Sequence, residues 1–194
     1  MRIIAACAIA FFATSATAEN LVINDARVQY TYWTDTRGPL HFCDLATTMI
    51  KAPMVVKLTA AFITDDTKPK DKDLTVAYIV EAFVVGAPKG SDKLESKEIK
   101  VVAGRIISDI FNSDLHAVRN VDKGLGASYT IPSEGSLALF ENVLTIRGAY
   151  TLAVDFQNNA SLIVNVKPTP EIFGPSEKWN KCSIAIMQHQ PPPR

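Results

Sequence analysis

The chain has 194 residues, is 47% hydrophobic and 21% charged, and carries 20 Lys+Arg against 20 Asp+Glu. This composition is that of an ordinary globular protein, which excludes intrinsic disorder, and the length suffices to bury a core without a structural metal. Because the formal net charge is zero, there is no long-range attraction for nucleic acid or anionic lipid, and we expect neither as a partner.

The N-terminus has the layout of a secretory signal peptide. Arg2 precedes an apolar run over residues 3–13, and Ala16-Thr17-Ala18 forms a small-x-small cleavage site. The run is shorter than the roughly 20 residues of a membrane span, and no later run reaches that length, so no membrane span is expected. We expect cleavage after Ala18, which removes the signal peptide 1–18. A periplasmic or secreted chain then remains, with one domain over 19–190 and an extended Pro-rich tail over 191–194.

Cleavage would remove Cys7 and leave two cysteines, Cys43 and Cys182. Two thiols in an oxidising compartment most simply pair, and free buried thiols or a metal-bound cysteine are the alternatives. A bridge between Cys43 and Cys182 would close a loop of 139 residues (182 minus 43). For a loop of this length the chain-entropy model gives about 4–5 kcal/mol of stabilisation. We expect the disulfide to join the first part of the fold to its last strand.

Alternating and β-branched apolar runs predict a mainly β fold. The expected strands cover residues 28–33, 40–45, 54–64, 74–85, 150–156, 162–166 and 182–188. A charged loop over 65–73 would join the two long strands, and Asn158-Asn159 would turn the hairpin between 150–156 and 162–166. The expected architecture is an antiparallel β-sandwich, of which the immunoglobulin-like form is one version, with one or two short helices.

Two segments are ambiguous between helix and strand, 96–112 and 136–147. From Ile99 to Phe111 the apolar residues follow the i, i+3, i+4, i+7 spacing, which narrowly favours a helix. Gly104 weakens that prediction by about 1 kcal/mol relative to alanine.

No catalytic motif is present around the three histidines His41, His116 and His189. Triads are defined by geometry rather than spacing, so an exported hydrolase with a triad assembled from distant loops around His41 or His116 stays an alternative. A non-enzymatic protein is favoured over an enzyme, and no catalytic residue is assigned.

Cys182, Met187 and His189 supply the ligand types of a blue-copper site. The set resembles that of the cupredoxins, but that family has the order Cys, His, Met, whereas this chain has Cys, Met, His. On a straight strand, Cys182 would also point away from the other two. We expect no metal or cofactor, and a copper-binding periplasmic protein is the least favoured alternative.

Tyr30, Tyr32 and Trp33 form an aromatic group suited to a sugar or a partner protein. Strand alternation places Trp33 on an outward face with Gln29 and Thr31, and packing of all three rings in the core is the alternative. The leading hypothesis is an exported, non-enzymatic binding or interaction module of the bacterial envelope, with an unknown protein or carbohydrate ligand.

Overall fold

The structure is a computed structural model that describes residues 20–69, 74–87, 93–108, 112–116, 124–131, 149–157, 160–167, 169–188 and 190. The predicted signal peptide, the ambiguous segment 136–147, His189 and the tail 191–194 lie outside these residues, as do residues 70–73 of the loop predicted at 65–73 and the whole turn predicted at 158–159.

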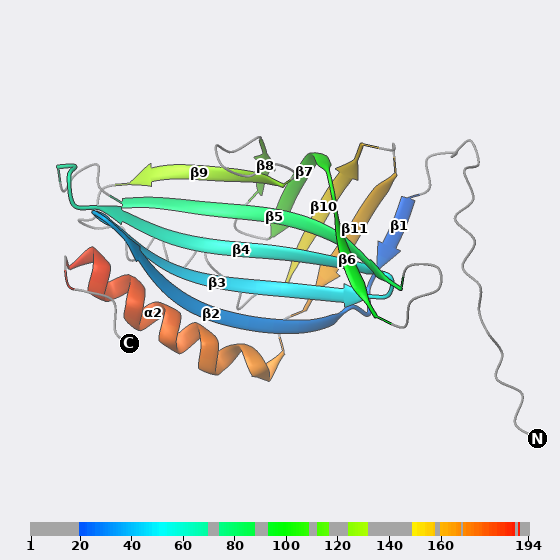
Figure 1. The fold of residues 1–194 in the computed structure, drawn as a ribbon, viewed down its shortest axis with the longest axis horizontal. Coiled ribbons are helices and arrows are strands. Elements are labelled where there is room, and N and C mark those ends of the chain that lie inside the picture. The colour runs from blue at the N-terminus through cyan, green and yellow to red at the C-terminus, as the bar shows by residue number, and fades with distance from the viewer. Residues whose placement is uncertain are drawn as a thin grey trace, which may run out of the picture.

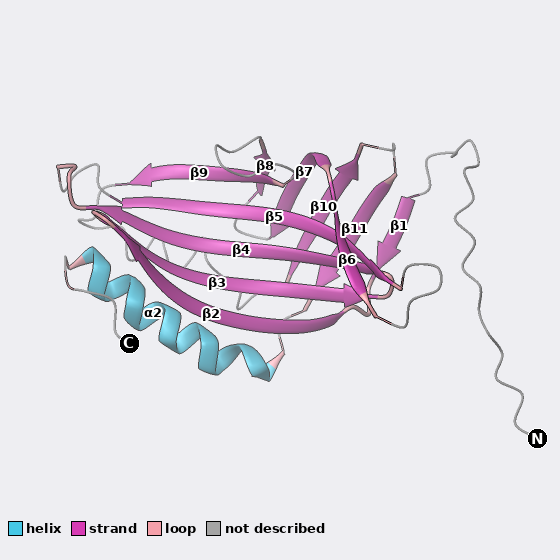
Figure 2. Ribbon diagram, viewed as in Figure 1, coloured by secondary structure: helices cyan, strands magenta, loops and turns pink. Residues whose placement is uncertain are grey.

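The described chain is mostly β-strand, arranged in two sheets with one short C-terminal helix (Figures 1 and 2). The long sheet has the order β2 (Arg27–Arg37), β3 (Leu40–Lys51), β4 (Met54–Asp65), β5 (Leu74–Gly86), β6 (Glu95–Ile99), and β9 (Leu125–Ile131) pairs with the first half of β5. The short sheet has the order β1 (Asn20–Ile23), β11 (Ser161–Val166), β10 (Tyr150–Phe156), β7 (Val101–Ser108), β8 (Asn112–Leu115). After β11 follow η1 (Pro170–Ile172) and α2 (Phe173–Met187). The predicted β-sandwich with a short helix is confirmed.

One face of the long sheet is buried by both the short sheet and α2. Near one end, Trp179 of α2 packs edge-on against Phe62 of β4, with ring centroids 4.9 Å apart. Farther along, Tyr150 of β10 is buried next to Thr47 of β3, and burial raises the pKa of Tyr150. Figure 1 shows the short sheet behind one end of the long strands and α2 running along β2. We call this the inner face and the opposite one the outer face.

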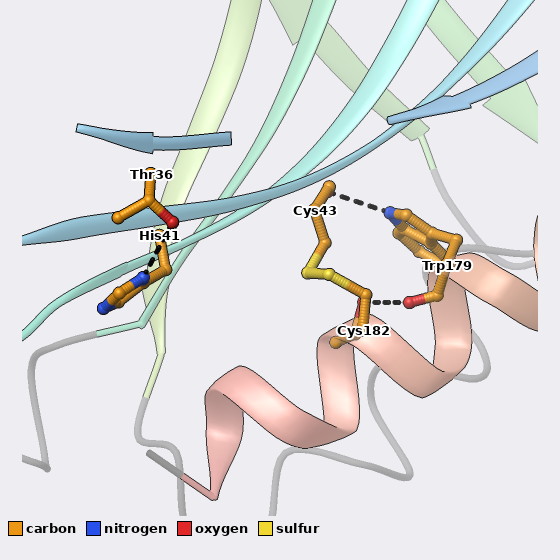
Figure 3. Close-up of a disulfide and its surroundings, with 6 residues drawn as sticks. Thr36, His41, Cys43, Trp179 and Cys182 are labelled. Carbon is orange, nitrogen blue, oxygen red and sulfur yellow. Dashed lines mark hydrogen bonds between the residues drawn. A yellow bond between two sulfur atoms is a disulfide. The ribbon is translucent and has the colours of Figure 1, made fainter. Parts of the chain in front are cut away.

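Two bonds attach α2 to the inner face and a third lies within the helix, and together they form what we call the α2 joint (Figure 3). The Cys43–Cys182 disulfide links β3 to the helix, with the two Cα atoms 5.9 Å apart, which confirms the predicted pairing. The indole Nε1–H of Trp179 donates to the backbone carbonyl of Cys43 at 3.0 Å. Ser183 donates its hydroxyl to the Trp179 carbonyl at 2.8 Å, inside the helix. All four side chains are buried.

The prediction that residues 182–188 form a last strand is wrong, because they end α2. The helical pattern begins upstream of Cys182: Ser176, Trp179, Ser183 and Ile186 are buried at spacings of three and four residues. Pro175 fits because it lies in the first turn, where its missing N–H has no partner to lose. Among the described residues no helix is long and apolar enough to cross a membrane.

The narrow preference for a helix from Ile99 is also wrong, because this segment contains the end of β6 and all of β7. In the pairing with β10, Asp155 is opposite Ala103 but Phe156 is opposite Val101, so Val102 is the extra residue of a β-bulge. The bulge shifts the alternation and turns both Val101 and Ile106 inward. Their odd, five-residue separation departs from the two-residue period by which a regular strand is recognised in a sequence.

The predicted hairpin between 150–156 and 162–166 is confirmed, as β10 and β11 pair antiparallel from Tyr150↔Val166 to Asp155↔Ser161. The two long apolar runs form the neighbouring antiparallel strands β4 and β5, as the charged loop between them predicted. Their central position explains the near-continuous apolar sequence, because core residues cover one face and small residues crowd the other.

Removing the disulfide should lower the free energy of unfolding by about 4–5 kcal/mol, because the bridge closes a loop of 139 residues in the unfolded chain. The double variant Cys43→Ala/Cys182→Ala and the unmodified protein would be compared by urea unfolding. Ser183→Ala, which removes only a buried hydrogen bond of the same helix, should cost about 1 kcal/mol. A loss for the double variant no larger than that of Ser183→Ala would contradict the role of the joint.

Candidate functional site

The structure does not bring the three predicted ligand-binding aromatics together. Tyr30 and Tyr32 point to the inner face, where the Tyr30 hydroxyl accepts the Thr169 backbone N–H at 3.3 Å. Tyr32 is half-buried, and burial raises its pKa. Trp33 points to the outer face with Gln29 and Thr31, as the alternation predicted. The two tyrosines are partly buried and pack against the core, whereas Trp33 lies on the opposite face of the sheet.

Trp33 belongs to a group of polar side chains on the outer face, which we call the Trp33 cluster. Its members are Trp33, Asp44, Lys57, Thr59 and Glu81. Asp44 is the direct cross-strand partner of Trp33 and accepts a hydrogen bond from its side chain. Lys57 and Glu81 are direct partners on β4 and β5 and form an ion pair of 2.9 Å. The Lys57 Nζ also lies 5.5 Å from the centre of the Trp33 ring, within range of a cation–π interaction.

Asp44 is the most perturbed carboxyl of this cluster. Burial raises its pKa to about 6, although the hydrogen bond from Trp33 and the positive charge of Lys57 lower it. The cause is desolvation, which penalises the charged form of a carboxyl on a sheet face. Asp44 therefore changes charge near neutral pH, a property more often found at functional sites than elsewhere on a surface.

Thr59 occupies the middle of the cluster. It lies two residues along β4 from Lys57 and so on the same face, with Ala46 and Ile79 as its cross-strand partners. Its side chain is 4% exposed, and its Oγ1 has no hydrogen-bond partner in the described structure. A buried hydroxyl without a partner costs about 1–3 kcal/mol, so a ligand atom or a water that reached it would be favoured.

A second group of polar side chains surrounds His41 at the tip of the β2–β3 hairpin. The Asp66 Oδ2 lies 3.0 Å from Nε2 of His41, and the Thr36 Oγ1 lies 3.2 Å from Nδ1 (Figure 3 shows Thr36 and His41). A carboxylate can only accept, so Nε2 carries the proton, and Nδ1 of the neutral ring is free to accept the Thr36 O–H. The sequence left a triad around His41 or His116 open as an alternative and named no partners for either histidine.

The turn chemistry explains why these groups meet. Gly38 has φ of 60°, which suits the first central position of a two-residue type II′ hairpin turn, and Pro39 supplies the second. This turn sets Thr36 opposite His41. The Asp66 backbone N–H donates to the Pro39 carbonyl at 3.0 Å, which holds the loop after β4 against the turn.

Among the described residues, the other candidates from the sequence are not brought together into a site. His116 is exposed and pairs through its backbone with Gly126, at 2.7 Å for each bond. Cys182 is oxidised in the disulfide and is thus no copper ligand, and His189 lies outside the described residues. In the part of the chain that the structure describes, no three His, Cys, Asp or Glu side chains are grouped to hold a metal ion.

Comparisons with models of protein families, with curated proteins and with solved structures found no match to this chain.

Asp44 should make the stability of the protein depend on pH. Between pH 3.8 and about 6 the folded state binds a proton that the unfolded chain releases. The free energy of unfolding therefore falls as pH rises through this window, by up to about 3 kcal/mol. Asp44→Asn should remove that loss, so its advantage over the unmodified protein should grow from pH 4 to pH 7 in urea unfolding.

Asp155→Asn, which changes an exposed carboxyl of β10, serves as the control for loss of one negative charge. Parallel pH dependence in Asp44→Asn and the unmodified protein would show that Asp44 titrates like an ordinary carboxyl.

Proposed function

We propose that this protein is an exported binding or interaction module of the bacterial envelope, and that the Trp33 cluster contacts its ligand. The observation that carries the proposal is the grouping of three unusual side chains on the outer face. A partly exposed indole, a carboxyl with raised pKa and a buried hydroxyl that has no hydrogen-bond partner among the described residues lie together there, opposite the packed inner face.

Export is supported by two independent features. The first 18 residues have the charge, length and small-x-small end of a signal peptide. The Cys43–Cys182 disulfide is compatible with an oxidising compartment and is unusual in a reducing cytosol.

The chemistry of the cluster favours a polar ligand that offers several hydroxyl or amide groups. Trp33 gives apolar ring surface, Asp44 and Glu81 accept hydrogen bonds, and Lys57 donates them. A few fixed polar groups beside an aromatic ring are the usual composition of a specific binding site. A carbohydrate of the envelope or a polar segment of a partner protein meets these requirements.

If the Trp33 cluster binds the ligand, Trp33→Ala should weaken binding by about 30-fold, the effect of losing an aromatic hot spot worth about 2 kcal/mol. The protein would be expressed with its own N-terminus and recovered in its oxidised form. Binding to a panel of envelope oligosaccharides would be measured by calorimetry. A photo-crosslinking amino acid at position 33 in living cells would capture a protein ligand.

Phe173, which is 65% exposed on α2, provides the matched control. Phe173→Ala should leave binding unchanged, and a crosslinker at position 173 should not capture the same partner. Equal binding by Trp33→Ala and Phe173→Ala, or equal crosslinking from both positions, would refute the assignment of the site.

A further inference from the structure

The geometry around His41 points to a second activity: we infer that Thr36, His41 and Asp66 form a nucleophilic triad that hydrolyses short-chain carboxylic esters. This inference is independent of the binding function, because the His41 group lies at the hairpin tip and shares no residue with the Trp33 cluster. It also gives residues to the alternative stated in the sequence analysis, an exported hydrolase with a triad around His41 or His116.

The three side chains form a hydrogen-bonded row, Asp66–His41–Thr36, that can activate the Thr36 hydroxyl as a nucleophile. Asp66 accepts from Nε2–H of His41 at 3.0 Å and fixes the tautomer. Nδ1, left with its lone pair, lies 3.2 Å from the Thr36 hydroxyl and can take its proton. A nucleophile beside a base that a third group orients is the arrangement that defines such sites on unrelated folds.

Of the two neighbouring carboxylates Asp65 and Asp66, Asp66 is the one that contacts His41. The neighbouring Asp65 is already occupied, since Oδ1 accepts both the backbone N–H and the hydroxyl of Thr67, and Lys68 lies 3.6 Å from Oδ2. Those bonds lower the pKa of Asp65, led by the Thr67 hydroxyl. Asp66 instead turns to His41, whose side chain is only 21% exposed, so the carboxylate acts on a partly desolvated ring.

The reaction follows the usual two steps of acyl transfer. Thr36 Oγ1 attacks the acyl carbon while its proton moves to Nδ1 of His41. The bond to the alcohol then breaks, and Nδ1 gives the proton to the leaving oxygen. Water attacks the acyl-threonine, again with Nδ1 as base, which releases the carboxylic acid and returns the proton to Thr36. Because Thr36 is exposed on the edge strand β2, the substrates are esters with an accessible acyl group, such as acetyl.

The test is hydrolysis of p-nitrophenyl acetate by the oxidised full chain. Thr36→Val keeps the shape and strand preference of the side chain but removes the hydroxyl, and it should lower kcat/KM by about a hundredfold, within the range of general-base catalysis. Thr36→Ser should retain activity. Peptide mapping after an acid quench should locate an acetyl group on Thr36. Asp66 is a positioning residue, so Asp66→Asn should lower kcat and leave KM unchanged.

Two matched controls distinguish the triad from its surroundings. Asp65→Asn and Thr67→Ala change the adjacent carboxyl and the adjacent hydroxyl, and both should leave kcat/KM unchanged. Circular dichroism would confirm that each variant is folded. Unchanged activity in Thr36→Val, an acetyl group found only on other residues, or a native rate no higher than that of free imidazole would overturn the inference. None of these outcomes depends on whether the Trp33 cluster binds a ligand.

Discussion

The attachment of α2 to β3 is the constraint on which this structure depends. The long sheet has more inner face than the short sheet covers, and α2 closes the remainder. The helix is attached by a covalent bond and by a hydrogen bond. Cys182 forms a disulfide with Cys43, and the indole N–H of Trp179 donates to the backbone carbonyl of Cys43. One strand position thus fixes the place of the helix, and the buried rings of Trp179 and Phe62 follow from it.

Strand β3 also shows how one sheet serves two purposes. Cys43 points to the inner face and is fully buried, whereas its neighbour Asp44 points to the outer face and titrates near neutral pH. Successive side chains of a strand point to opposite faces of the sheet, so a residue that packs in the core is followed by one that lies on the outer face. The packed inner face keeps β2, β3, β4 and β5 in register, and that register brings Trp33, Asp44 and Lys57 together.

The sequence was sufficient for those features that depend on local pattern or on simple counting. The apolar runs of β4 and β5 and the hairpin of β10 and β11 follow from composition and turns, and the disulfide was predicted because Cys43 and Cys182 are the two cysteines outside the expected signal peptide. The α2 helix does not follow from the residues after Cys182 alone, because its buried pattern begins upstream at Ser176. The bulge at Val102 could not be seen either, since it exists only in the pairing with β10.

The candidate functional residues also divide into those that local sequence predicts and those that depend on the tertiary structure. The pairing of Thr36 with His41 could have been deduced, because Gly38-Pro39 is a two-residue turn and counting outward from it sets the two opposite each other. Asp66 could not, because its approach to His41 depends on where the loop after β4 lies. The raised pKa of Asp44 depends on neighbours from separate strands, and no local pattern encodes that environment.

Hydrogen exchange of backbone amides most directly tests whether the joint makes α2 part of the cooperative core. Amides of the second half of α2, around Cys182 and Ile186, should open only with global unfolding and so match the protection of Phe62 in β4. Exchange in α2 that is orders of magnitude faster than at Phe62, in the oxidised protein, would show that the helix opens independently and would contradict the account.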